Sequence, residues 1–148
     1  MNQYVVVPAR FDTGRVLIGG FAATIVITLM MYFGASMMTG APLDIAGELS
    51  GMIGAPWIVG MVIHFALGTV AFSFAYAFVV CRFLPGSAAL RGVMWGVILW
   101  LVAMLIMGPM MGKGLFMGAT PAAIASLAGH IAYGLTLGLI VPIPPERA

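Results

Sequence analysis

The chain has 148 residues, of which 63% are hydrophobic and only 7% are charged. A soluble domain carries roughly 25% charged residues, so this composition excludes an apolar core enclosed by a water-facing surface. The net charge of +2 is too small for a nucleic-acid-binding surface. The single cysteine excludes an internal disulfide and any multi-cysteine metal site. We therefore expect one transmembrane domain, residues 1–148, surrounded by lipid.

Apolar runs along the chain are long enough to cross a bilayer as helices. A helix needs about 20 apolar residues to span the hydrocarbon core, and backbone groups in lipid need partners within their own segment. The predicted spans are at about residues 16–38, 57–80, 93–111 and 121–141. The expected fold class is all-α, a four-helix transmembrane bundle.

Prolines mark several ends of these spans. Pro56 precedes the second span and Pro121 opens the fourth, and proline suits the first turn of a helix. Pro109 follows Gly108 near the end of the third span, and it is expected to kink that helix or end it early. The fourth span is expected to stop before Pro142, Pro144 and Pro145.

The first connection, between the first two spans, is predicted to contain a short helix. Apolar residues recur at helical spacing over residues 43–53, which is typical of a helix lying in the membrane interface. Asp44 and Glu48 lie four positions apart and share one helix face. We expect that face to be solvated, with a cation site or a basic partner as the alternatives.

The cations predict the orientation of the chain. Five of the six lie on one side of the predicted bundle, namely Arg10, Arg15, Arg82, Arg91 and Arg147. Only Lys113 lies on the other side. The positive-inside tendency therefore predicts a multi-pass protein of the inner (cytoplasmic) membrane, with both termini cytoplasmic and the connections 40–56 and 112–120 outside.

Reporter fusions test this orientation directly. Fusions at position 86 and at the C-terminus are expected to report the cytoplasm, and fusions at positions 47 and 115 the opposite side, because of the charge asymmetry. A fusion at 47 that reports the cytoplasm would overturn the whole assignment.

The second half of the sequence resembles the first. Residues 64–68 read HFALG and residues 130–134 read HIAYG, and each segment follows a proline by eight or nine residues. Met37-Met38 and Met110-Met111 occupy corresponding ends of the first and third spans. This pattern predicts two repeated helical hairpins related by a pseudo-twofold axis along the membrane normal.

The paired histidines, His64 and His130, carry the sharpest chemical hypothesis. They are the only residues of the Asp, Glu, Lys, Arg or His types well inside a predicted span, and such residues are candidates for function. Small residues lie four positions to either side of each histidine: Gly60 and Gly68 around His64, and Ser126 and Gly134 around His130. These strips lack bulk, so a flat macrocycle or another helix can approach.

Three interpretations of His64 and His130 are open. Two imidazoles at similar depth are typical of axial ligands to haem b. Close helix packing through small residues, with each histidine hydrogen-bonded across the bundle, explains the same pattern. Proton, quinone or metal roles form the third interpretation.

Methionine is abundant, with 13 residues. Thioethers select Cu(I), but methionine also fills irregular apolar gaps. Without cysteine or histidine beside them, packing is the favoured interpretation of the methionines near the predicted outer ends of the spans: Met37, Met38, Met52, Met107, Met110, Met111 and Met117.

The predicted spans lack the groups of an acid–base enzyme. They contain no Asp, Glu, Lys or Arg, and the chain has no glycine-rich phosphate loop, HExxH or GxSxG motif. Hydroxyl residues in the spans have no evident base beside them, so no nucleophile is proposed. We therefore expect a protein that is not an enzyme.

The glycine-rich first span, the Pro42-Leu43-Asp44 segment and the paired His-x-Ala-x-Gly helices resemble a group of small four-helix bacterial and archaeal membrane proteins of unknown function, some in respiratory gene neighbourhoods. The resemblance covers residues 19–140. The resemblance implies a membrane location and a respiratory partner. The small size, the lack of catalytic groups and the small-residue strips favour an accessory, structural or assembly subunit of a larger membrane complex, with other membrane subunits or further copies of the chain as partners. The alternatives are a haem b electron-transfer protein that uses His64 and His130, and a small transporter or channel.

Overall fold

The computed structural model describes residues 12–118 and 120–141. Arg10, Arg147 and the prolines expected to end the fourth span lie outside the described residues. Four helices are long and apolar enough to cross a membrane: Thr13–Thr39, Trp57–Phe78, Ala88–Met110 and Pro121–Ile140. No strand occurs in the described ranges, so the predicted all-α bundle with four spans is confirmed.

Three of the four spans consist of α-helix interrupted by a π-helical segment. The first span is α1 (Thr13–Leu29), η1 (Met30–Gly34) and α2 (Ala35–Thr39). The second is α4 (Trp57–Ala66), η2 (Leu67–Phe72) and α5 (Ser73–Phe78). The third is α6 (Ala88–Val102), η4 (Ala103–Met107) and α7 (Gly108–Met110), and the fourth is α8 (Pro121–Ile140). The predicted short helix is α3 (Ile45–Ile53), and 3-10 turns occur at η3 (Val80–Arg82) and η5 (Leu115–Gly118).

Local chemistry sets most helix ends. Pro56 immediately precedes α4 and Pro121 is the first residue of α8, as predicted. The third span begins at Ala88 rather than near residue 93, because the Ser87 side chain accepts a hydrogen bond from the Leu90 amide and caps the helix.

Pro109 lies in the last turn of the third span, which ends at Met110. Proline has no amide donor, and its ring clashes with the carbonyl four residues earlier in a regular α-helix. The π-helical turn η4 directly precedes Gly108 and Pro109. The wider turn accommodates the proline, and the helix then stops, which confirms the expected change at this position.

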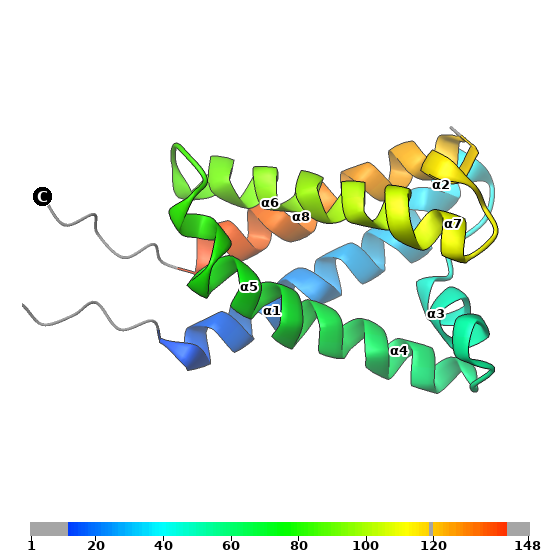
Figure 1. Cartoon of the computed structure of the whole chain (residues 1–148), viewed down its shortest axis with the longest axis horizontal. Helices are drawn as coiled ribbons and strands as arrows, with labels where there is room; N and C mark the ends of the chain where they lie inside the picture. The colour runs from blue at the N-terminus through cyan, green and yellow to red at the C-terminus, as the bar shows by residue number, and fades with distance from the viewer. Residues whose placement is uncertain (1–11, 119, 142–148) are drawn as a thin grey trace, which may run out of the picture.

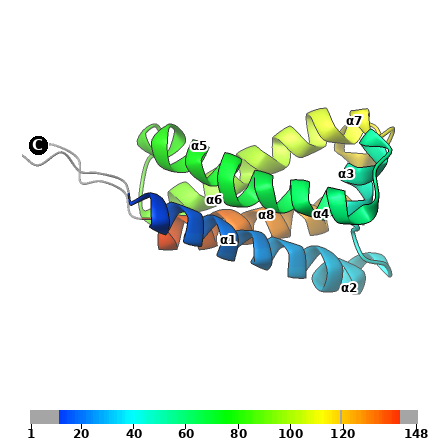
Figure 2. The ribbon, with the colours of Figure 1, turned by 90° about the horizontal axis from the view of Figure 1, so that it is seen from below.

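Glycines bring α6 and α8 into close contact. Gly92 and Gly96 of α6 face Gly134 and Gly138 of α8, and a Cβ added at any of these four positions would clash with backbone of the facing helix. Small residues four apart allow this approach between membrane helices. Helix α1 packs on α8 and on η2, and the four spans run roughly along one direction (Figures 1 and 2).

The second and third spans separate toward one end of the bundle. In Figure 1 the ribbons of α4 and α6 diverge to the right, where α3 lies, whereas the start of α1 and the end of α8 lie at the left. Helix α3 packs against α4. We call the right-hand end in Figure 1 the α3 end.

The π segments of the first and third spans follow the predicted repeat. The same offset of 73 residues separates Met37 from Met110 and η1 from η4. The second and fourth spans differ, because η2 has no π-helical counterpart in α8. The repeat stays a prediction, supported at η1 and η4.

Candidate functional site

A cavity of about 330 Å³ lies inside the bundle toward the α3 end. All four spans and α3 contribute to its wall. Its polar lining residues are Thr24, Glu48, His64, Lys113, Ser126, His130 and Tyr133. The remaining lining residues are apolar side chains and two glycines. A mostly apolar wall with a few polar groups is typical of small-molecule sites.

Each π-helical segment lines this cavity. Met31 comes from η1, Leu67 and Phe72 come from η2, and Met104 and Met107 come from η4. A π turn changes the register of the side chains after it, and such turns occur frequently at functional sites. The three π-helical segments η1, η2 and η4 therefore help to form the cavity wall.

His64 is half-buried and lies on the cavity wall from α4. Its Nε2 atom is 2.9 Å from the Thr28 hydroxyl oxygen on the neighbouring helix α1. The same hydroxyl donates its proton to the Thr24 carbonyl at 2.6 Å. Since a hydroxyl has one proton to donate, Nε2 of His64 is the donor to Thr28.

His130 is also half-buried and lines the same cavity from α8. Its Nδ1 atom is 2.8 Å from the carbonyl oxygen of Ser126, one turn earlier in the helix. A carbonyl can only accept, so Nδ1 of His130 carries the proton. The structure thus brings both predicted site histidines to one cavity. Within the described residues, His64 is hydrogen-bonded to another helix and His130 to its own helix.

Other helices fill the small-residue strips beside the histidines. A Cβ at Gly60 would clash with the Ala46 carbonyl of α3, and one at Gly68 with the Thr24 side chain of α1. Gly134 lies against the backbone of α6, and Ser126 is buried. These residues serve helix packing, and Gly68 and Ser126 also line the cavity. Haem ligation by His64 and His130 stays a prediction.

Two further hydrogen bonds fix the polar part of the wall. The Tyr133 hydroxyl donates to the Gly68 carbonyl in η2 at 2.6 Å, which joins the fourth span to the second. The Thr24 hydroxyl donates to the Gly20 carbonyl at 2.7 Å. Both hydroxyl protons are therefore committed to backbone carbonyls.

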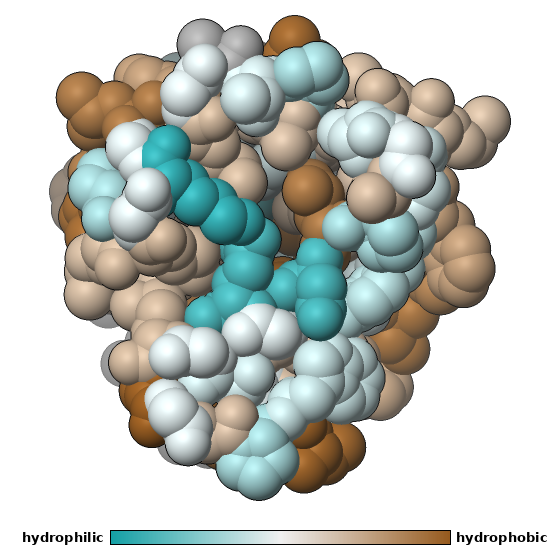
Figure 3. Space-filling view, turned by 90° about the vertical axis from the view of Figure 1, so that its right-hand side faces the viewer, coloured by the Kyte–Doolittle hydropathy of each residue, from teal (hydrophilic) through white to brown (hydrophobic). Residues whose placement is uncertain are grey.

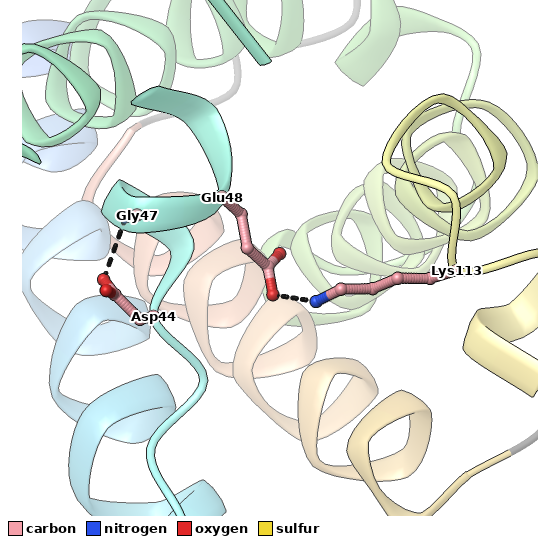
Figure 4. Close-up of polar contacts among 4 residues, drawn as sticks. All are labelled: Asp44, Gly47, Glu48 and Lys113. Atoms are coloured by element: carbon pink, nitrogen blue, oxygen red, sulfur yellow. Dashed lines mark hydrogen bonds and ion pairs between the residues drawn. The ribbon is translucent and has the colours of Figure 1, made fainter. Parts of the chain in front are cut away.

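Glu48 and Lys113 form an ion pair at the α3 end of the cavity. Glu48 projects from α3 and Lys113 from the connection after α7, so the pair joins two separate walls (Figure 4). Figure 3 shows a hollow in this face with hydrophilic side chains around it. The two side chains are 22% and 37% exposed, and such pairs contribute less than about 1 kcal/mol. The pair matters for its position across the cavity rim.

Asp44 anchors α3 to the first two spans. Its Oδ1 atom accepts hydrogen bonds from Tyr32 Oη at 2.5 Å, Trp57 Nε1 at 2.9 Å and the Gly47 amide at 3.0 Å. Burial raises the pKa of the Asp44 carboxyl, but these hydrogen bonds outweigh burial and hold the pKa below its ordinary value.

The prediction that Asp44 and Glu48 form a solvated face of α3 is therefore wrong. Asp44 is bonded to neighbouring segments and Glu48 is paired with Lys113. Both carboxylates bind partners from elsewhere in the chain. The spacing of residues within α3 cannot predict those partners.

The methionines divide into two groups that the sequence did not distinguish. Met37 and Met110 are 90% and 63% exposed and face away from the bundle. Met31, at 5%, and Met104, at 4%, are buried on the cavity wall, and neither was among the methionines singled out from the sequence. The sequence does relate Met31 to Met104, because the 73 residues between them equal the offset between Met37 and Met110 in the predicted repeat.

Comparison with known proteins identifies a family for this chain. A family model described as a family of unknown function, DUF6789, matches residues 12–146. No curated protein and no solved structure is detectably similar to the chain. The membrane character rests on the four apolar helices, and the family match agrees with the expected resemblance to proteins of unknown function. The match covers nearly the whole sequence, and the chain therefore belongs to the DUF6789 family.

Proposed function

We propose that this protein binds a small, largely apolar molecule inside the membrane, in the cavity at the α3 end of the bundle. The observation that carries the proposal is the cavity itself, which has a volume of about 330 Å³ and is bounded by all four spans and α3. Ligand sites have volumes of roughly 300–1,000 Å³, with apolar walls and few polar groups. The size and the lining both fall in this class.

The side chains of the wall support the same function. Five methionines line the cavity: Met31, Met104, Met107, Met111 and Met117. Methionine is flexible and polarisable, so it adapts to the shape of an apolar guest. The charged lining residues, Glu48 and Lys113, are paired with each other at the rim, which leaves the interior to uncharged molecules.

A cavity-filling variant tests the proposal. Ala103 lines the cavity from η4, whereas Leu101 is 37% exposed on the outside of the same span. Ala103→Phe is expected to fill the cavity, and Leu101→Phe is the matched control that adds an aromatic ring facing lipid. The probe is 1,2,4,5-tetramethylbenzene, added to purified protein in detergent.

Thermal unfolding supplies the measurement. The probe is expected to stabilise the wild type and Leu101→Phe by roughly 1–3 kcal/mol at concentrations of about 10–100 times its Kd. Ala103→Phe is expected to show no stabilisation. Equal responses of all three proteins would overturn the proposal, since the probe would then act through the micelle.

The accessory role in a larger respiratory complex stays a prediction, as does the transporter or channel alternative. A binding protein with little mass outside the bilayer suits an accessory position, because a partner must then use or release the bound molecule. Purification in mild detergent, followed by identification of co-purifying membrane subunits, tests that role. A chain that purifies alone or only with copies of itself would contradict it.

A further inference from the structure

We infer that the cavity recognises a hydroquinone-type molecule, an apolar aromatic ring with two hydroxyl groups, in preference to the corresponding quinone. The inference rests on the proposed binding function and names its ligand class. It depends on which nitrogens of His64 and His130 carry protons, and on the other polar groups that the cavity offers.

Among the described residues, one nitrogen of each histidine has no hydrogen-bond partner. Nε2 of His64 donates to Thr28, whose own proton is held by the Thr24 carbonyl. Nδ1 of His130 donates to the Ser126 carbonyl. In an apolar interior the imidazole is neutral and carries a single proton. Nδ1 of His64 and Nε2 of His130 are therefore hydrogen-bond acceptors.

The described cavity wall has few free hydrogen-bond donors, among them the Ser126 hydroxyl, which lies 3.4 Å from Nδ1 of His130. The hydroxyl protons of Thr24 and Tyr133 are committed to the carbonyls of Gly20 and Gly68. Lys113 is held by Glu48 at the rim. A quinone presents only acceptor oxygens, so it makes no hydrogen bond to the two acceptor nitrogens of the histidines. A hydroquinone presents two donors, which match the two acceptor nitrogens.

An aromatic ring suits the rest of the wall. Thioether sulfurs make favourable contacts at ring edges, and Met31 and Met104 are buried on the cavity wall. Phe72 and Tyr133 add aromatic surface to the same cavity. The histidines thus select the donor groups and the apolar wall selects the ring.

Three probes with one ring system test this inference on the wild-type protein. Tetramethylhydroquinone, kept reduced under anaerobic conditions, offers two donors. Tetramethyl-1,4-benzoquinone and the dimethyl ether of the hydroquinone offer none. The hydroquinone is expected to bind with a Kd on the order of 10-fold lower than either of the others, because only the hydroquinone donates hydrogen bonds to the two histidine nitrogens.

Histidine variants assign the effect to the two nitrogens. His64→Phe and His130→Phe are each expected to reduce the preference for the hydroquinone several-fold, while binding of the dimethyl ether remains. His130→Gln places an amide oxygen near the position of Nε2 and is expected to restore part of the preference. Because the wild-type comparison needs no variant, a variant that fails to fold does not remove the test.

The remaining outcomes separate this inference from the proposed function. Equal binding of all three probes would overturn the hydroquinone preference and leave the binding cavity in place. Binding of none of them, together with equal responses of the wild type, Leu101→Phe and Ala103→Phe to tetramethylbenzene, would overturn both. Stoichiometric binding of Cu(I) or haem that is lost in both histidine variants would show that the bare nitrogens ligate a metal, and would also overturn the hydroquinone assignment.

Discussion

Gly96→Ala is expected to destabilise the bundle by roughly 1–3 kcal/mol, although alanine is the better helix former by about 1 kcal/mol. A Cβ at position 96 would clash with the His130 carbonyl on α8. Neither backbone can move without separating α6 from α8, and the contact continues through Gly92 and Gly134. Gly96→Leu is expected to prevent assembly of the bundle.

Gly34→Ala is the matched control for this prediction. A Cβ at position 34 would meet only the Cβ of Met30, at an ordinary distance of 3.9 Å. The variant is therefore expected to be as stable as the wild type or more stable. Thermal unfolding of both variants in one detergent provides the measurement. If Gly96→Ala matches Gly34→Ala in stability, α6 and α8 are not in contact through these glycines.

Asp44→Ala is expected to release α3 from the bundle, with a loss on the order of 3 kcal/mol. The substitution removes a helix cap worth about 1 kcal/mol and the hydrogen bonds from Tyr32 and Trp57 to a charged acceptor. Limited proteolysis is expected to cut within residues 43–56 of the variant and to leave the wild type intact. Asp44→Asn keeps an acceptor oxygen at the cap, so it is the control with the smaller loss.

The attachment of α3 is expected to depend on pH only in acid. The folded-state pKa of Asp44 is lowered from its ordinary value of 3.8. A lowered carboxyl pKa gives stabilisation that is fully present above about pH 4 and is lost as the pH falls through the folded-state value. Proteolysis of the wild type is therefore expected to be constant between about pH 5 and 8. A rise in cleavage within that range would contradict the role of Asp44.

The four spans and the prolines at two of their helix starts could be predicted from the sequence. The bilayer fixes the length of a spanning helix, and lipid forbids unpaired backbone groups, so long apolar runs have one structural solution. Pro56 and Pro121 mark their helix starts because proline fits a first turn and little else in a helix. A similar depth for His64 and His130 could also be predicted, because the rise per residue from the prolines is nearly the same, and the structure places both on one cavity.

The cavity and the hydrogen-bond partners around it could not be predicted from the sequence. Spacing predicted bare strips around the histidines, but α3, α1 and α6 occupy the space beside Gly60, Gly68 and Gly134. The partners of Glu48 and Asp44 come from Lys113, Tyr32 and Trp57, which lie in other segments. The π turn η2 has no sequence signal that we identified.

The sequence by itself determined that this chain forms four apolar helices with a short helix in the first connection, because chain length within a bilayer and backbone hydrogen bonding are local constraints. Only the tertiary structure decided which side of each helix faces inward. In water the apolar face of a helix identifies its buried side, but lipid is as apolar as the protein interior. Met31 and Met37 are therefore equivalent residues by composition, and helix packing alone buries the first against the cavity and leaves the second exposed.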